Sequence, residues 1–122
     1  MHDRYARLVR LISDYVDRNF RAAFQYDERD WTALYVRPDL ATEDLQAAVP
    51  ALADRARSHE PLVREPDYPE LGTQRASISL HAEAVLVHFN EGPQSGVVAT
   101  LETDVARNLS QFVARCESVL FE

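Results

Sequence analysis

The sequence contains no lysine, a single cysteine and only three glycines. Because Cys116 is alone, the chain forms no internal disulfide and has no cysteine cluster for zinc. Two of the glycines fall in E-G-P-Q-S-G (91–96), which leads into the apolar run V-V-A-T-L. A phosphate-binding loop normally opens a helix and includes a lysine, so we interpret this segment as a hairpin loop.

Long apolar runs are also missing. No stretch approaches the ~20 apolar residues that span a bilayer. The first fifteen residues are charged throughout and lack the apolar core of a secretory signal. We therefore expect a cytoplasmic protein whose residues 1–122 form a single domain.

Charge is strongly biased toward acids. Thirteen arginines face twenty Asp and Glu residues, for a formal net charge of −7. This balance disfavours nucleic acid as a partner, since phosphate neutralisation supplies most of that affinity, and it disfavours anionic membrane surfaces. Abundant acid without lysine suggests a salt-rich cytoplasm, although a GC-rich genome alone gives a similar bias.

Hydrophobic periodicity predicts three helices and five strands in the order α-β-β-α-β-β-β-α. The expected helices are residues 3–20, about 42–58 and 104–120, and the expected strands are about 21–26, 31–37, 74–83, 84–91 and 96–102. Thr42 is the expected N-cap of the middle helix, and Pro50 should kink it. Cys116 lies on the apolar stripe of the last helix, where we expect it to be buried.

These elements predict an α+β fold with one five-stranded antiparallel sheet and helices packed on it. The middle helix is long enough to cross the sheet, so that the fifth strand can pair beside the first. Strand 84–91 is almost continuously apolar, as a strand buried on both sides should be. Strand 74–83 alternates apolar and polar residues, as an edge strand with one open face should.

The segment F-R-A-A-F-Q-Y-D-E-R-D-W-T-A-L-Y-V-R-P-D-L (20–40) resembles the opening of small uncharacterised proteins of halophilic archaea. The matching residues are Tyr26, Asp27, Tyr35, Arg37, Asp39 and Leu40. This resemblance implies salt adaptation and a cytoplasmic location, and it brings no known activity. The element order resembles that of the roadblock and profilin-like α/β modules, many of which dimerise and regulate GTPases or motors.

The segment S-I-S-L-H-A-E-A (77–84) raises the question of catalysis. Read with period two, it places Ser77, Ser79, His81 and Glu83 in one row. Amides in the middle of a strand are committed to the sheet and cannot form an oxyanion hole, and no Gly-x-Ser-x-Gly motif exists here. We interpret the row as the solvent face of an edge strand, not a catalytic set.

The sequence gives little support for a metal or cofactor site. His88 lies in the most apolar strand, where a lone histidine is usually packed and hydrogen-bonded. A metal needs at least three convergent ligands. His81, Glu83 and His88 could converge across paired strands, but no spacing requires it, so we expect no metal and no cofactor.

Two classes of function remain. The favoured one is a non-catalytic interaction or regulatory module that binds a second copy of itself or another protein. Its expected interface is one face of the second strand, where Trp31 and Tyr35 would lie together. The alternative is a small-ligand sensor or minor enzyme that uses the polar strand face near Ser79, His81, Glu83 and His88. A pocket with shifted acids would favour the alternative, and a flat apolar patch would favour the interaction module.

Overall fold

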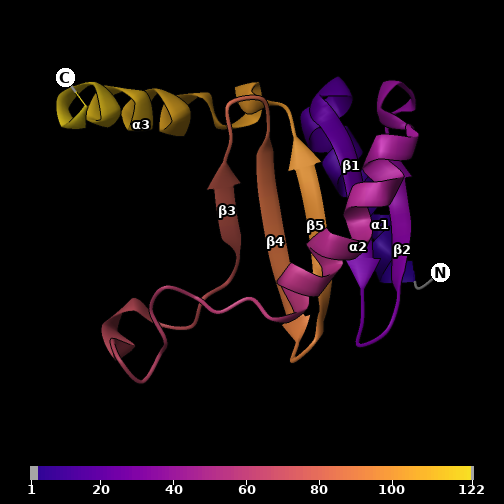
Figure 1. Cartoon of the computed structure of the whole chain (residues 1–122), viewed down its shortest axis with the longest axis horizontal. Coiled ribbons are helices and arrows are strands. Elements are labelled where there is room, and N and C mark those ends of the chain that lie inside the picture. Colours follow the sequence, from indigo (N-terminus) through magenta and orange to yellow (C-terminus); the bar gives the residue numbers. More distant parts are fainter. Residues whose placement is uncertain (1–2, 122) are drawn as a thin grey trace.

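The computed structural model describes residues 3–121 and contains one five-stranded antiparallel sheet, which confirms the predicted α+β fold. The strands are β1 (Phe20–Tyr26), β2 (Trp31–Val36), β3 (Ser77–Leu80), β4 (Val85–Gly92) and β5 (Ser95–Leu101), and the helices are α1 (Asp3–Val16), α2 (Glu43–Arg57) and α3 (Arg107–Leu120). The sheet order is β2-β1-β5-β4-β3 (Figure 1). β1 therefore pairs with β5, and β2 and β3 are the two edges, as the sequence predicts.

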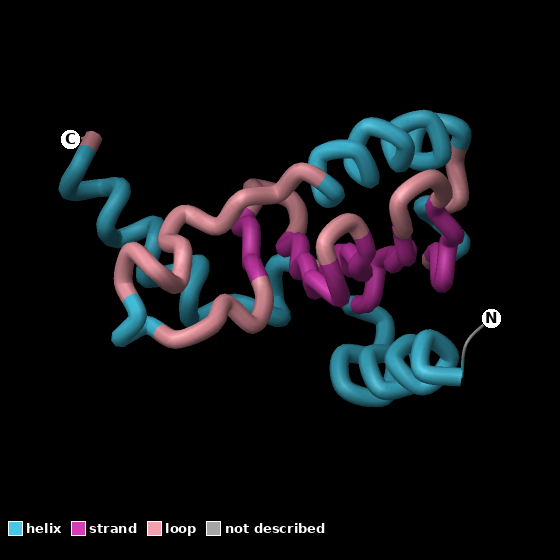
Figure 2. Tube along the Cα trace, turned by 90° about the horizontal axis from the view of Figure 1, so that it is seen from below, coloured by secondary structure: helices cyan, strands magenta, loops and turns pink. Residues whose placement is uncertain are grey.

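Two helices cover opposite faces of the sheet at its β2 end (Figure 2). Under α2, Phe24, Tyr26 and Val98 form a buried cluster with Val49 and Ala53 of the helix. On the α1 side, a second buried cluster consists of Phe20, Ala23, Ala99 and Leu101. Val9, Ile12 and Val16 of α1 pack against this second cluster.

The helix boundaries follow local chemistry. α1 ends at Val16 instead of continuing to residue 20, because Asp17 has a positive φ of 53° that no right-handed helix accommodates. The predicted cap of α2 is confirmed, since the Thr42 hydroxyl accepts a hydrogen bond from the Leu45 amide at 3.3 Å. Pro50 lies within α2. No helix within residues 3–121 has the length and hydrophobicity to cross a membrane.

The edge strand β3 is shorter than predicted. It covers Ser77–Leu80 instead of 74–83, because the chain turns immediately afterwards, where the His81 amide donates to the Ala84 carbonyl at 2.9 Å. The interpretation of the row that begins with Ser77 as the solvent face of this strand is wrong at Ser77, and Ile78, which alternation would then direct inward, faces solvent. Ile78 is 57% exposed on a part of the sheet that no helix covers, whereas Ser77 is half-buried on the α2 side.

The C-terminal helix departs furthest from expectation. A short 3₁₀ turn, η4 (Thr103–Ala106), precedes it, and α3 then extends beyond the β3 edge, away from the sheet (Figure 1). Among the elements of residues 3–121, α3 packs substantially against η4 alone, and none of the α3 residues is buried. Cys116 is therefore exposed, and the expectation of a buried cysteine is wrong.

Candidate functional site

A buried histidine lies under the C-terminal end of α2. His88 of β4 is 6% exposed, and its Nε2 lies 2.6 Å from the Tyr26 hydroxyl of β1. Burial lowers the pKa of His88, and the neighbouring His59 lowers it further. Burial also raises the pKa of Tyr26. Both groups are therefore neutral near pH 7, and the prediction of a packed, hydrogen-bonded His88 is confirmed.

Next to this pair, the His59 Nε2 lies 3.0 Å from the Ser77 hydroxyl. The His59 and His88 rings meet edge to face with centroids 5.2 Å apart. The cavity beside them has a volume of about 150 Å³, which is below the ~300–1,000 Å³ of ordinary small-molecule sites. Its lining consists of Leu52, Arg55, Ala56, His59, Ser77, Ser79, Leu86, His88 and Val98.

The four residues of the predicted ligand face are therefore divided. Ser79 and His88 line this cavity, while His81 and Glu83 are exposed in the turn between β3 and β4. Within residues 3–121, no group of three or more His, Cys, Asp or Glu side chains is placed to hold a metal ion. Sequence reasoning missed His59 and Tyr26 as neighbours of His88, because both approach it from elements far away in the chain.

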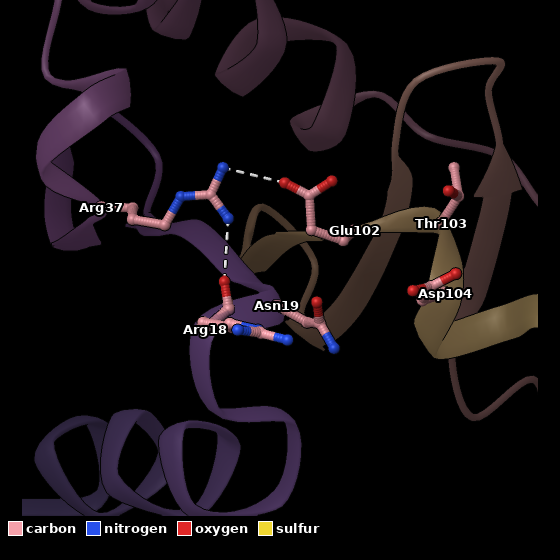
Figure 3. Close-up of a pocket in the computed structure, with 6 residues that line it drawn as sticks. All are labelled: Arg18, Asn19, Arg37, Glu102, Thr103 and Asp104. Atoms are coloured by element: carbon pink, nitrogen blue, oxygen red, sulfur yellow. Dashed lines mark hydrogen bonds and ion pairs between the residues drawn. The ribbon is translucent and has the colours of Figure 1, made fainter.

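An arginine cluster lies at the opposite end of the sheet (Figure 3). Arg37 donates to Asp39 at 2.6 Å, to Glu102 at 2.8 Å and to the Arg18 carbonyl at 2.8 Å. Arg21 also contacts Glu102, at 3.3 Å. The bonds from Arg37 lower the pKa of Asp39 and of Glu102, and they raise the pKa of Arg37 itself. Because its charges are paired with one another, this cluster joins chain segments and leaves little free charge for a ligand.

The surface beside this cluster is hollowed over about 420 Å³. Its lining residues are Arg18, Asn19, Arg37, Glu102, Thr103 and Asp104. Of the side chains drawn in Figure 3, Arg37 and Glu102 point toward each other and form an ion pair. We call the ion-paired cluster of Arg37, Asp39, Glu102 and Arg21 the clamp, because it joins separate chain segments. We interpret the hollow as the outer surface of this clamp.

The two aromatic residues of the expected interface lie on opposite faces of β2. Opposite the Ala23–Phe24 step, β2 has one extra residue, Leu34, so its register shifts. Trp31 consequently packs against the cluster under α2, while Tyr35 stacks on Phe20 at a centroid distance of 4.4 Å on the α1 side. The expectation that they share one face is wrong, because simple alternation does not anticipate the bulge.

Several large apolar residues of α3 are left in water. Phe112 is 64% exposed and Leu120 is 72% exposed. A second region, the α1-side surface of β3 and β4, is only partly covered, and we call it the open face. Its residues are Ile78, which is exposed, and Leu80, Val87 and Phe89, which are half-buried. α1 covers the open face incompletely, because its substantial sheet contacts are with β1 and β2.

The chain matches the family model described as Domain of unknown function (DUF7522) over residues 6–121. The protein belongs to this family. A comparison with curated proteins finds no match. The DUF7522 match begins within α1 and extends one residue past α3, so the exposed C-terminal helix lies inside the family's domain.

The residues that prompted the sequence resemblance have structural positions within the DUF7522 domain. Asp27 accepts hydrogen bonds from the Arg29 and Asp30 amides at 3.0 and 2.9 Å and so closes the β1–β2 turn. These bonds lower the pKa of the Asp27 carboxyl. Arg37 and Asp39 belong to the clamp, in which Arg37 also binds Glu102 after β5. The motif therefore specifies the hairpin and its attachment to the sheet.

Proposed function

We propose that this DUF7522 protein is a non-catalytic interaction or regulatory module that acts as a homodimer in the cytoplasm. The observation that supports the proposal is the amount of apolar surface left in water on α3 and on the open face. Soluble monomers rarely expose contiguous apolar surface beyond a few hundred Å², and larger patches mark contact sites. The element order, which resembles that of the roadblock and profilin-like modules, favours the same class of function.

Sedimentation of the wild-type chain over a wide concentration range in molar salt tests the proposal. We expect the mass of a dimer at micromolar concentration. A chain that remains monomeric at the highest concentration overturns it. Two surfaces are candidates for the contact: the edge strand β2 with Trp31 and Tyr35, and the exposed surface of α3.

A minor hydrolytic activity is the second candidate function, favoured by the 3.0 Å contact between His59 and Ser77. In a serine hydrolase, a histidine at this distance accepts the hydroxyl proton. Hydrolysis of p-nitrophenyl acetate tests it, with Ser77→Ala as the variant and Ser79→Ala as its control. Turnover that is lost only in Ser77→Ala supports this candidate, and equal rates in both variants exclude it.

A further inference from the structure

We propose that α3 of one copy packs on the open face of a second copy, and that the exchange is reciprocal. Each homodimer then contains two identical contacts related by a two-fold axis, as closed dimers require. This inference rests on the proposed function and deepens it, because it names the partner of the exposed helix: another molecule of the same chain.

The helix has the surface that such a contact needs. Its apolar residues recur at intervals of three and four and so occupy one side of α3. They are Leu109, Phe112, Val113, Cys116, Val119 and Leu120. Arg115 and Glu117 lie on either side of this stripe. An amphipathic helix of this kind gains most of its stability from burying the apolar side, and within one copy that side has no partner.

The open face has complementary chemistry. Ile78 lies directly opposite Val87, and Leu80 lies opposite Val85, so all four side chains point to the α1 side of the sheet. Phe89 follows Val87 by two residues on the same face. No charged residue occupies these positions, and the surface they form is apolar from the β3 edge inward.

One flank of α1 borders the open face. Arg4 reaches across to Glu91 at the end of β4 and pairs with it at 3.1 Å, which orients this flank of α1 toward β4. Leu8, Leu11 and Tyr15 follow Arg4 at intervals of four, three and four residues and so share that flank. Leu11 is 62% exposed and Tyr15 is 86% exposed. A helix on the open face would therefore contact apolar side chains beside it as well as beneath it.

The dimensions fit one helix. β5, β4 and β3 span two inter-strand spacings, or about 9.6 Å, and neighbouring helices pack about 8–10 Å apart. The fourteen residues of α3 extend roughly 21 Å, while the eight residues of β4 extend roughly 26 Å. One helix beside α1 would cover the open face along most of its length.

The direction of α3 points to another copy. An i→i+3 hydrogen bond from the Val105 amide to the Glu102 carbonyl and an ion pair between Arg107 and Asp104 hold the turn that precedes the helix. From this turn, α3 leads past β3 and away from its own open face (Figure 1). Reaching its own sheet would require this turn to be rebuilt, whereas a second copy can accept the helix as it stands.

The expected area is that of a stable dimer. In each copy, seven exposed apolar residues lie on the stripe, the open face and its α1 flank. Their exposed surface, on the order of 100 Å² each, approaches the ~800 Å² per partner of an interface of ordinary size. The seven are Leu11, Tyr15, Ile78, Leu109, Phe112, Val119 and Leu120.

Replacing Phe112 by aspartate tests the helix side. Phe112 contributes little to the folded monomer, so we expect Phe112→Asp to leave the far-ultraviolet circular dichroism unchanged and to weaken dimerisation at least tenfold in sedimentation. Leu62→Asp is the matched control, because Leu62 is fully exposed in the connection after α2. If Phe112→Asp dimerises as strongly as the control, the proposed packing of α3 on the open face is wrong, but the proposed homodimer is not contradicted. A wild-type monomer contradicts both proposals.

Thiol cross-linking tests the geometry. Cys116 lies on the stripe of α3, so an Ile78→Cys variant that retains it has one thiol on each proposed contact surface. A short bismaleimide should then link two chains, while Ser79→Cys, on the opposite sheet face, and the wild-type chain should stay largely unlinked. A link that forms within a single chain, or equal yields in all three proteins, overturns the exchange.

Discussion

Tyr26 connects three parts of the molecule through one side chain. It belongs to β1, its hydroxyl lies 2.6 Å from His88 Nε2 on β4, and the same hydroxyl is 3.4 Å from the Ala56 carbonyl of α2. It is also 1% exposed. A phenol fits here because its ring fills the core while its hydroxyl satisfies a buried histidine.

Tyr26→Phe should therefore destabilise the protein although the ring is retained. Removing the hydroxyl leaves the buried His88 nitrogen without its partner, which costs about 1–3 kcal/mol. Urea unfolding measures the loss in the free energy of unfolding. Tyr15→Phe is the control, because Tyr15 is 86% exposed, and it should not change stability in the monomer. Equal stability of the two variants would contradict the role given to the hydroxyl.

His88 predicts a pH dependence with a definite sign. Its pKa in the folded state is lowered by burial and by His59, while in the unfolded chain it titrates near the ordinary value of about 6.5. As pH falls below about 6.5, His88 therefore binds a proton in the unfolded chain but stays unprotonated in the folded chain. The free energy of unfolding should decrease from pH 7.5 to pH 5.5 and level off once pH drops below the folded-state pKa.

His88→Gln isolates this contribution. Glutamine retains a polar group near Tyr26 but does not titrate, so urea midpoints of the variant should vary less between pH 7.5 and 5.5 than those of the wild type. If both proteins show the same slope in this window, the pH dependence arises from another group.

At the scale of elements, the sequence predicted the number of strands, the β1–β5 pairing and the cap of α2. These features depend on short-range periodicity, on Thr42 and on the reach of one helix. The bulge at Leu34 and the early end of β3 at Leu80 were not predictable in the same way. Both arise where the backbone meets a neighbouring strand or turns locally, and alternation of side chains contains no signal for either.

The candidate sites were predictable only in part, for a related reason. The sequence indicated a packed His88, but Tyr26 and His59 lie 62 and 29 residues away from it in the chain and approach it only in the folded sheet. The stripe on α3 was visible from its period. Periodicity says that a surface is to be buried and does not say against which element or which molecule.

The β4–β5 hairpin contains a glycine next to the Tyr26 side chain, and the contact between Tyr26 and His88 requires the space that this glycine leaves. A Cβ at Gly96 would lie 2.7 Å from the Tyr26 hydroxyl and would also collide with the Phe89 carbonyl. Gly96→Ala should therefore lower the free energy of unfolding by at least about 1–3 kcal/mol, the usual cost of overpacking. Gly92→Ala is the control in the same hairpin, because its Cβ would meet only the rotatable Ser95 hydroxyl, at 3.1 Å. A thermal midpoint for Gly96→Ala equal to that of Gly92→Ala would contradict this reading of the packing.

At the scale of the whole molecule, the acid excess opposes both folding and association. Two copies at −7 each bring together a formal charge of −14. The ion pairs at Arg37 and Arg4 are partly exposed, so they contribute little to stability, and their loss through salt screening is small beside the relief of repulsion. The unpaired carboxylates repel one another over distances that reach about 30 Å in 0.01 M salt and shrink to about 3 Å at 1 M.

Stability should therefore rise with ionic strength. We expect the thermal midpoint to increase, and the dimer dissociation constant to decrease, from dilute buffer to molar sodium chloride. The matched control is a variant with Glu28→Gln, Glu70→Gln and Glu83→Gln, three exposed carboxylates, which lowers the formal charge from −7 to −4. Its midpoint should depend less on salt, because there is less repulsion to screen. If salt raises the thermal midpoint of the variant and of the wild type by the same number of degrees, salt acts on apolar burial instead of charge. A wild-type thermal midpoint that does not change with salt points to a GC-rich source without salt adaptation.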